Sequence, residues 1–307
     1  MTKAPLLVAD IGGTRARFAR SPAPGKLAER CLELPVVEHP TFEAALESAL
    51  AQLGAPPPAR LAVAVAGPVA EGRARLTNGV WALDEKELAR RFGFSKVRLY
   101  NDFEAVALAL PLLGKDDLEP LGGGPGVATA PRVVLGPGTG LGVAALVARE
   151  GTAFPVAGEG GHVSLPSASA EEDEILCALR ARFGHVSAER AVSGQGLENL
   201  YTVLGGSACP AAEIAKRAAA GDPAARDALR HFAAFLGTVA ADLALSFGAR
   251  GGVYLAGGVL PKLGEAFDRD VFRQRFEGKG RFSTYLAGIP RYLILNTESG
   301  LLGLTAV

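Results

Sequence analysis

The run Leu6-Leu7-Val8-Ala9-Asp10-Ile11-Gly12-Gly13-Thr14 decides the fold prediction for this chain. An apolar, strand-like segment ends in a carboxylate and two glycines, and a second strand-like segment, 16–19, follows. This pattern predicts a tight β-hairpin. Glycine lets backbone N–H groups approach a ligand that a side chain would block, and threonine adds a hydroxyl donor. The turn, with Gly12, Gly13 and Thr14, is therefore a candidate phosphate-binding loop.

Asp10 allows two interpretations, because it stands where the strand ends and the turn begins. Its carboxylate, a hard oxygen ligand, could hold a Mg²⁺ ion and its water shell beside phosphates. Alternatively, the residue caps its own turn in an ordinary hairpin. The residues alone leave both interpretations open.

A second run, Gly136-Pro137-Gly138-Thr139-Gly140-Leu141-Gly142, repeats the pattern between the apolar segments 133–135 and 143–147. Gly138, Thr139 and Gly140 form the candidate phosphate cradle. A Rossmann dinucleotide site would need Gly-x-Gly-x-x-Gly before a helix, but Gly142 misses that spacing and β-branched Val143 follows. Two such loops from two halves of one chain predict a polyphosphate gripped between them.

Length and composition bound the class of protein. The chain has 307 residues, 49% of them hydrophobic, and a net charge of zero, which allows two lobes with sizeable cores. A nucleic-acid or anionic-membrane surface would need clustered positive charge, so neither partner is expected. Cys31, Cys177 and Cys209 are far apart, which is typical of a reduced protein with small buried thiols. We find no signal peptide or bilayer-spanning run and expect a soluble, cytoplasmic protein.

Periodicity and breaker residues place the main elements. Strands are expected at 61–66, 97–100, 253–256 and 291–295. Helices are expected at 41–53, 84–92, 222–248 and after Ser299, and the segment 171–247 is expected to be mostly helical. Residues 114–131 are expected to form a linker or surface excursion. Thr41, Asp84 and Asp222 are residue types that commonly cap helix N-termini, and Gly248 is expected to end the long helix that begins at Asp222.

The pair Asn101-Asp102 follows the strand at 97–100. Asn101 and Glu104 have the spacing of a capping box, so the pair could simply begin a helix. Asp102 also stands at the carboxyl edge of a strand, where ligands of α/β sheets gather. There it could take a proton from a hydroxyl that attacks a phosphate. Spacing alone does not separate these interpretations, and both can hold together.

Three further groups have chemistry of their own. Glu159-Gly160-Gly161-His162 lacks the helix and the additional ligands of a metal site, so hydrogen bonding to a polyhydroxylated ligand fits it better. Glu189-Arg190 is a polar pair before Ser193-Gly194 that could equally be a surface ion pair. Gly257-Gly258, after an apolar strand, is either a plain turn or a place where a base or ribose lies close to backbone.

Taken in order, these segments resemble the bacterial ATP-dependent glucokinase family of the hexokinase and actin-like superfamily. The matching runs cover nearly the whole chain: Ala9-Asp10-Ile11-Gly12-Gly13-Thr14, Ala66-Gly67-Pro68, Leu76-Thr77-Asn78-Gly79-Val80-Trp81, Asn101-Asp102-Phe103-Glu104-Ala105, 135–142, 158–165, Glu189-Arg190-Ala191-Val192-Ser193-Gly194, Leu255-Ala256-Gly257-Gly258-Val259 and Gly300-Leu301-Leu302-Gly303. Each run is weak alone, but their order is highly specific.

The resemblance implies a two-lobed, actin-like (ribonuclease H-like) α/β fold with a cleft between the lobes. The small α/β lobe would be 1–110, completed by a C-terminal helix at 297–307, and the larger α+β lobe 111–296. The implied reaction is transfer of the γ-phosphoryl group of ATP to the 6-hydroxyl of D-glucose, feeding glycolysis. Family members are commonly homodimers, so a homodimer is expected.

By position, the resemblance also implies roles for single residues. Asp102 matches the catalytic base, and the sugar-binding residues are Asn101, Asp102, Glu159, His162 and Glu189. The phosphate-binding turns match Asp10, Gly12, Gly13, Thr14, Gly138, Thr139 and Gly140, and the adenosine motif matches Gly257 and Gly258. Asp10 would hold Mg²⁺ through water.

Arg15 is a departure from the family pattern, which commonly has asparagine there, so the role of Arg15 near the phosphates is open. Two alternatives to glucokinase remain. One is a kinase of the same fold for mannose, fructose or an N-acetylated sugar. The other is a non-catalytic sugar sensor, which would be expected to carry an added DNA-binding helix-turn-helix.

Overall fold

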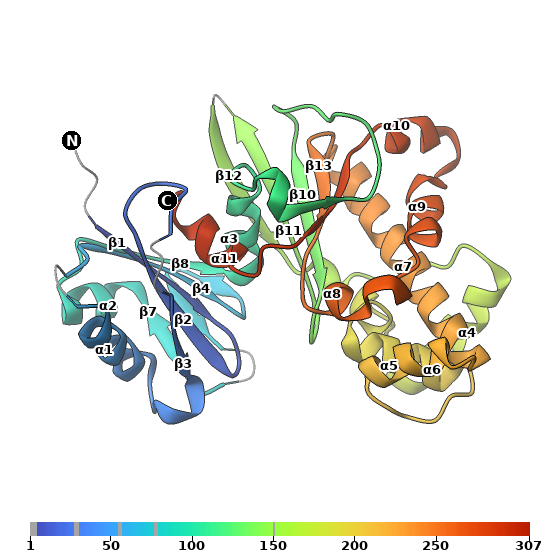
Figure 1. Ribbon diagram of the computed structural model, residues 1–307, viewed down its shortest axis with the longest axis horizontal. Helices are drawn as coiled ribbons and strands as arrows, with labels where there is room; N and C mark the ends of the chain where they lie inside the picture. The colour runs from blue at the N-terminus through green and yellow to red at the C-terminus, as the bar shows by residue number, and fades with distance from the viewer. Residues whose placement is uncertain (1–4, 28–30, 55–56, 77–78, 150) are drawn as a thin grey trace. The chain divides into compact units, whose positions relative to one another are not determined.

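A computed structural model describes residues 5–27, 31–54, 57–76, 79–149 and 151–307 (Figure 1). The chain divides into two compact units: unit 1 comprises 1–114 with 296–307, and unit 2 comprises 115–295. The lobes expected at 1–110 with 297–307 and at 111–296 stay predictions. The run 76–81, quoted for the family resemblance, lies partly outside the described residues.

Unit 1 is built on a five-stranded sheet of order β3-β2-β1-β4-β8. The strands are β1 (Leu6–Ile11), β2 (Arg15–Ser21), β3 (Cys31–Pro35), β4 (Arg60–Val65) and β8 (Lys96–Asn101). β1, β2 and β3 form an antiparallel meander, whereas β4 lies parallel to both β1 and β8. The carboxyl ends of β1, β4 and β8 therefore meet at one edge of the sheet.

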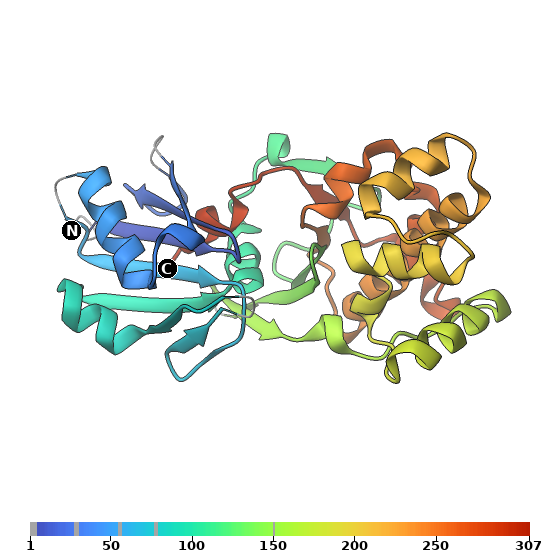
Figure 2. The same ribbon diagram turned by 90° about the horizontal axis from the view of Figure 1, so that it is seen from below.

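Helices cover both faces of this sheet, as Figures 1 and 2 show. Leu7 and Ile11 of β1 share a core with α1 (Phe42–Leu53) and α2 (Glu85–Phe92). Leu6 and Val8 face the other side, with α3 (Asp102–Ala109) and α11 (Ser299–Leu304). Strand side chains alternate between the faces, so a strand buried on both faces is apolar throughout.

The last helix belongs to unit 1 because of a close crossing with α3. A Cβ atom on Gly303 would lie 1.8 Å from the carbonyl oxygen of Ala105. Only glycine allows the two backbones to approach this closely. Close helix packing therefore explains the glycine at position 303. A small antiparallel sheet of β5 (Val69–Ala70), β6 (Arg73–Arg75) and β7 (Ala82–Asp84) completes the unit.

Unit 2 repeats this plan in a sheet of order β12-β11-β10-β13-β14-β9. The strands are β9 (Leu118–Pro120), β10 (Arg132–Pro137), β11 (Leu141–Arg149), β12 (Thr152–Gly158), β13 (Gly252–Leu255) and β14 (Arg291–Ile294). β10, β11 and β12 are antiparallel neighbours, and β13 is parallel to β10 and β14. The predicted repetition of the first hairpin is thus confirmed at the level of the whole sheet.

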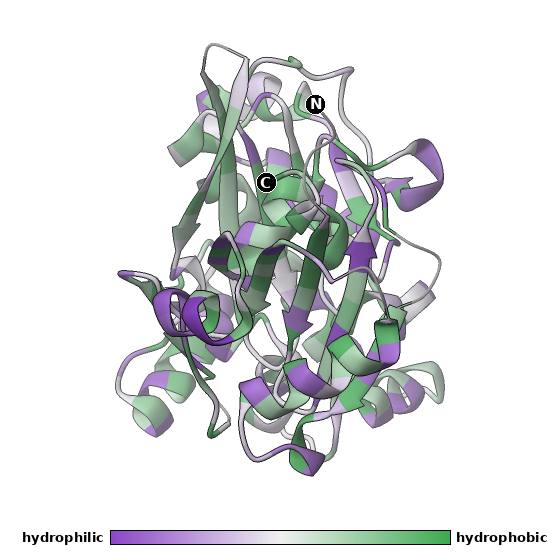
Figure 3. Cartoon of the chain, turned by 90° about the vertical axis from the view of Figure 1, so that its left-hand side faces the viewer, coloured by the Kyte–Doolittle hydropathy of each residue, from purple (hydrophilic) through white to green (hydrophobic). Residues whose placement is uncertain are grey.

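The helices of unit 2 pack around one long helix. They are α4 (Ala170–Phe183), α5 (Gly194–Val203), α6 (Ala211–Ala219), α7 (Pro223–Phe247), α8 (Val259–Leu263), α9 (Arg269–Glu277) and α10 (Ser283–Ala287). Among the described helices α7 alone is long and apolar enough to cross a membrane, but 78% of its apolar window is buried. It is the core helix of the unit. Across the chain, Figure 3 shows mostly hydrophobic colour on strands and mixed hydrophobic and hydrophilic colour on helices.

Most predicted elements are confirmed, including the N-caps Thr41, Asp84 and Asp222. The expected linker at 114–131 is wrong in part, because β9 pairs with β14 at the edge of the unit 2 sheet. The expectation of buried thiols is also wrong for Cys177, which is exposed. Cys31 and Cys209 are half-buried, and none of the three forms a disulfide.

Candidate active site

The first glycine loop (12–14) is the turn between β1 and β2. The N–H of Gly12 donates to the carbonyl oxygen of Arg15 at 2.9 Å, and the carbonyl of Thr14 accepts from the N–H of Val36. Gly13 and Thr14 are exposed. Within the described part of the chain, their N–H groups donate to no protein acceptor. These two amides and the threonine hydroxyl are thus the donors that the loop offers.

Asp10 pairs across the hairpin with Arg17. The two residues lie directly opposite one another in the register of β1 and β2. Arg17 Nη2 donates to Asp10 Oδ2 at 2.5 Å, and Nη1 donates to the carbonyl of Thr297 at 2.9 Å. A Cβ on Gly300 would lie 3.6 Å from the same Oδ2. A guanidinium and the start of α11 therefore fix the carboxylate.

Arg15 lies beside the loop but on the surface. Its guanidinium pairs with Glu33 at 2.6 Å, and the two side chains are 69% and 44% exposed. Such an exposed ion pair contributes little to stability. In the structure this arginine pairs with β3 rather than with Asp10.

Asn101 and Asp102 mark the end of β8 and the first residue of α3. The predicted capping box is confirmed: the N–H of Phe103 donates to Asn101 Oδ1, and the N–H of Asn101 donates to Glu104 Oε2, both at 2.9 Å. Asn101 Nδ2 also donates to the carbonyl of Gly67 at 3.2 Å, which ties the ends of β4 and β8 together. Asp102 is half-buried, and its Oδ1 accepts from the N–H of Phe103.

Burial raises the pKa of Glu104 above its ordinary value, and the hydrogen bond from the backbone of Asn101 opposes this shift. The capping box thus places a partly desolvated carboxyl three residues after Asn101. Because Asn101 is both the cap and a predicted sugar residue, the two interpretations of this pair are compatible.

The second glycine loop (138–140) is the turn between β10 and β11. The N–H of Gly138 donates to the carbonyl of Gly140 at 2.8 Å, and the N–H of Gly194, the first residue of α5, donates to the carbonyl of Gly138 at 2.9 Å. In the described residues, the N–H groups of Thr139 and Gly140 donate to no protein acceptor. The first glycine of each loop is thus used internally, and the next two amides are available to a ligand.

Glu189 reaches this loop from a short 3₁₀ helix, Ala188–Arg190. Its Oε2 accepts the N–H of Leu141 at 2.9 Å. The alternative of a surface ion pair with Arg190 is wrong, because the guanidinium of Arg190 lies over the ring of Phe183, 4.3 Å from its centroid. A predicted sugar residue therefore supports a predicted phosphate loop.

Glu159 and His162 bound a second 3₁₀ helix, Gly160–His162, which follows β12. Both side chains are exposed, and the N–H of His162 donates to the carbonyl of Glu159 at 2.9 Å. A Cβ on Gly161 would lie 2.1 Å from the carbonyl oxygen of Leu141, so this segment packs directly on the second hairpin. Exposed groups on a fixed turn suit a polar ligand.

Gly257 and Gly258 follow β13 and have different roles. Gly257 has a φ of +83°, and a Cβ there would lie 2.5 Å from the carbonyl oxygen of Pro137. Gly258 has no heavy atom within 4 Å of the corresponding position. Gly257 is required by the backbone, whereas Gly258 leaves open space beside it. The predicted unit 2 residues thus gather at the carboxyl ends of the parallel strands β10 and β13.

A magnesium site built only from protein groups is not found among the described residues, since no group of three acidic, histidine or cysteine side chains comes together. Asp10 is a single carboxylate with one oxygen already paired to Arg17. This donor set fits a Mg²⁺ ion that keeps its waters and takes its remaining ligands from phosphates.

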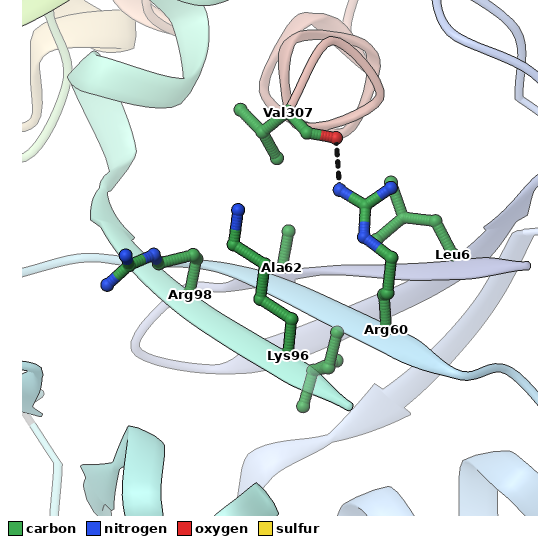
Figure 4. A pocket seen from close by; sticks show the side chains of 7 residues that line it. Leu6, Arg60, Ala62, Lys96, Arg98 and Val307 are labelled. Carbon is green, nitrogen blue, oxygen red and sulfur yellow. Dashed lines mark hydrogen bonds between the residues drawn. The ribbon is translucent and has the colours of Figure 1, made fainter. Parts of the chain in front are cut away.

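A small hollow in unit 1 lies at the opposite, amino ends of β1, β4 and β8 (Figure 4). Leu6, Arg60, Ala62, Lys96, Arg98 and Val307 line it, and Arg60 donates to the carbonyl of Val307 at 2.5 Å. Its cavity volume is about 10 Å³. A water needs about this much space, so the hollow is far too small for a sugar or nucleotide.

Sequence reasoning did not find two groups that the structure adds to the site. Arg17 could have been found, because a tight turn places it opposite Asp10. The amide of Leu141 could not, because its partner Glu189 lies 48 residues away along the chain.

Comparison with known proteins agrees with the predicted resemblance. The family model "Glucokinase" matches residues 7–307. A glucokinase of Ralstonia nicotianae is 46% identical, over 100% of this chain and 95% of its own length. The crystal structure of a glucokinase from an Antarctic psychrotroph is 33% identical, with a TM-score of 0.92 over 99% of this chain and 98% of that one.

The fold is shared more widely. A ROK family glucokinase from Streptomyces griseus, solved with glucose and AMPPNP, has a TM-score of 0.65 at 23% identity, over 98% of both chains. That similarity shows the actin-like kinase fold alone. The full-length family match and the closely similar sequences confirm more than the fold: the chain belongs to the glucokinase family, a family of ATP-dependent hexose kinases.

Proposed function

We propose that this enzyme transfers the γ-phosphoryl group of ATP to the 6-hydroxyl of D-glucose, giving glucose 6-phosphate and ADP. The full-length match to the glucokinase family carries the proposal. The solved complex of the same fold with glucose and the ATP analogue AMPPNP supports both substrates.

Asp102 is the catalytic base of this mechanism. It begins α3 at the carboxyl end of β8, and the capping box fixes its backbone. The carboxylate orients the 6-hydroxyl and accepts its proton as the bond to phosphorus forms. Phosphoryl transfer asks the protein mainly for in-line positioning and charge neutralisation.

The sugar is bound by Asn101, Glu159, His162 and Glu189 together with Asp102. A carboxylate can accept from two hydroxyl groups at once, which suits a polyhydroxylated ring. Asn101 accepts the helix-cap hydrogen bond with Oδ1 and donates one amide hydrogen to the carbonyl of Gly67, which orients its side chain and leaves the second amide hydrogen for a sugar hydroxyl.

The two glycine loops bind the phosphates of ATP. Each offers two exposed or half-exposed amides and a threonine hydroxyl, from Gly13 and Thr14 in unit 1 and from Thr139 and Gly140 in unit 2. Asp10 would hold Mg²⁺ through water, and the ion neutralises phosphate charge when it is bound. Gly258 leaves space for the nucleoside beside the carboxyl end of β13.

The proposal extends to the setting of the enzyme. We place it in the cytoplasm, in glycolysis, as a homodimer, because members of the resembled family commonly have these properties. Kinases of the same fold for mannose, fructose or N-acetylated sugars, and a sensor without activity, are separated from this proposal by assay.

The deciding experiment is a coupled assay of ADP release with MgATP and a panel of hexoses. The expected result is the highest kcat/KM with glucose. A higher kcat/KM with another hexose would change the substrate, and ATP-independent sugar binding without turnover would identify a sensor.

A further inference from the structure

The carboxylate of Glu189 occupies the space beside the second glycine loop. A Cβ on Gly140 would lie 2.3 Å from Glu189 Oε2 and 3.2 Å from its Cδ. The position after Thr139 therefore has no side chain because the carboxylate is there. From the same place, Oε2 accepts the N–H of Leu141 at 2.9 Å.

We propose that Glu189 is a positioning residue for the second glycine loop, so that nucleotide binding depends on this side chain even when no sugar is present. The inference rests on the proposed function. It adds a role in nucleotide binding to a residue predicted to bind only the sugar.

The loop is held at its two ends. At the first end, the carbonyl of Gly138 accepts from the N–H of Gly194 at the start of α5. At the second end, the N–H of Leu141 donates to Glu189. The amides of Thr139 and Gly140, which are available to a phosphate, lie between these anchors. Both anchors therefore help to set the directions of these amides, together with the hydrogen bond from the N–H of Gly138 to the carbonyl of Gly140 inside the turn.

The backbone of Glu189 is itself fixed. Ser193, which is 1% exposed, donates its hydroxyl to the carbonyl of Glu189 at 2.9 Å and accepts the N–H of Gly196 at 2.8 Å. The carboxylate thus extends from a rigid base to Leu141. A hydrogen bond from an amide to an ionised carboxylate is stronger than one to a neutral acceptor, so this contact is an effective anchor.

The same side chain connects the sugar site to the loop. Oε2 accepts the N–H of Leu141, which leaves Oε1 for a sugar hydroxyl. The segment of Glu159 and His162 packs on the carbonyl side of Leu141 through Gly161. A bound sugar would restrict the Glu189 carboxylate and with it the loop. Such coupling is reciprocal, because linked equilibria change one another by the same factor.

The test measures the binding of AMPPNP with Mg²⁺ by calorimetry in the absence of sugar. We expect Glu189→Ala to weaken nucleotide binding by about tenfold, the typical effect of one lost hydrogen bond to a charged group. Glu189→Gln keeps an amide oxygen for Leu141 and should restore most of the affinity. The matched control is Glu174→Ala, which removes an exposed carboxylate of α4 outside the site and should leave the nucleotide affinity unchanged.

A second measurement keeps the inference testable if Glu189→Ala folds poorly. Glu189→Asp retains the charge but shortens the side chain, so the amide of Leu141 should lose its acceptor. Hydrogen exchange of the segment 138–142 should then be faster than in the wild type, with no sugar or nucleotide added.

Two outcomes would overturn the inference: wild-type nucleotide affinity in both Glu189→Ala and Glu189→Asp, or unchanged exchange of the segment 138–142. If a Glu189 variant lost glucose binding but showed either of these outcomes, Glu189 would bind only the sugar, and the proposed function would still hold. If the wild-type enzyme itself bound no AMPPNP, the proposed function would fail instead.

Discussion

Units 1 and 2 share one five-strand plan, yet the carboxylates beside their glycine loops come from different parts of the chain. In both units an antiparallel hairpin lies beside a parallel strand, β1-β2 with β4 and β10-β11 with β13. The parallel strand is tied in the same way, by Ala66 N–H to the carbonyl of Ile11 and by Ala256 N–H to that of Leu135. In unit 1, Asp10 belongs to the hairpin itself. In unit 2, Glu189 comes from a distant segment.

This difference shows what a repeated backbone plan decides and what it leaves to side chains. The plan brings a glycine turn and two available amides to the same edge of each sheet. The side chains that contact each loop or its hairpin differ between the two units. In unit 1 the carboxylate beside the loop, Asp10, is paired with the guanidinium of Arg17. The unit 2 loop rests on a predicted sugar residue.

The largest expected effect tests a group that only one unit has. β8 ends at Asn101 and is followed by Asp102, whereas the corresponding strand β14 is followed by Leu295. Asp102→Asn should lower kcat by about a hundredfold or more while glucose binding is kept, because a general base contributes that much. Steady-state kinetics and glucose titration measure this, with Asp116→Asn, an exposed acid in unit 2, as the control. A near-normal kcat would remove Asp102 as the base.

The next effect separates two adjacent glycines of unit 2. Gly257→Ala places a Cβ 2.5 Å from a backbone carbonyl at a positive φ, so it should lower the free energy of unfolding by about 2–4 kcal/mol. Gly258→Ala meets open space and should leave stability nearly unchanged. Denaturant unfolding compares the two variants. Equal stabilities would mean that the turn after β13 relaxes to accept a side chain.

The two loops themselves differ in how they accept a methyl group. Gly140→Ala displaces Glu189 and leaves the Leu141 amide unpaired, at an expected stability cost of about 1–3 kcal/mol. In Gly12→Ala the new Cβ lies 3.5 Å from the nearest atom, an ordinary contact, so the cost should be under about 1 kcal/mol. Thermal unfolding of both variants checks the contrast. The reverse order of stability would contradict the role of Glu189 as an anchor.

A smaller effect concerns the two arginines of the first hairpin. Arg17→Met removes the partner of the half-buried Asp10 and should cost about 1–3 kcal/mol. Arg15→Met removes an exposed pair and should cost less than about 1 kcal/mol. Unfolding curves at low and high salt measure both. Similar losses for the two variants would show that Asp10 does not depend on its cross-strand partner.

The smallest effect is a pH dependence in unit 1. Burial raises the pKa of Glu104, so the folded state holds the proton more tightly than the unfolded state. The stability from this group is complete below its ordinary pKa of 4.5 and is lost as pH rises through the raised value. Glu104→Gln keeps the capping box without titrating. The stability of the variant relative to wild type should therefore increase with pH from 4.5 upward, and a constant difference would contradict this.

Local signals in the sequence predicted the parts of the site that depend on neighbouring residues. The glycine turns are recognisable from their own residues, and the spacing of Asn101 and Glu104 defines a capping box by itself. The predicted local position of Asp102, at the start of a helix after a strand, is therefore confirmed. Its catalytic role stays a prediction that rests on the family resemblance.

Non-local contacts were the limit of the prediction. β9 is three residues long and gains its pairing from β14, far along the chain, so a run of glycine and proline around it indicated only a linker. Glu189 was expected to bind sugar or to pair with the neighbouring Arg190. Its contact with Leu141 could not be predicted, because it forms only after β10, β11 and α5 have come together.

The position of α11 on unit 1 has a consequence for the order of folding during synthesis. Unit 2 is one continuous segment, whereas unit 1 needs residues from both ends of the chain. The N–H of Gly25 donates to the hydroxyl of Thr305, and Gly303 packs on α3, so the segment 296–307 is needed to complete the packing of unit 1. Domains generally fold as units while the chain emerges from the ribosome. Unit 2 can therefore fold before residues 296–307 are made, whereas one face of the unit 1 sheet is covered only by α3 until those residues emerge.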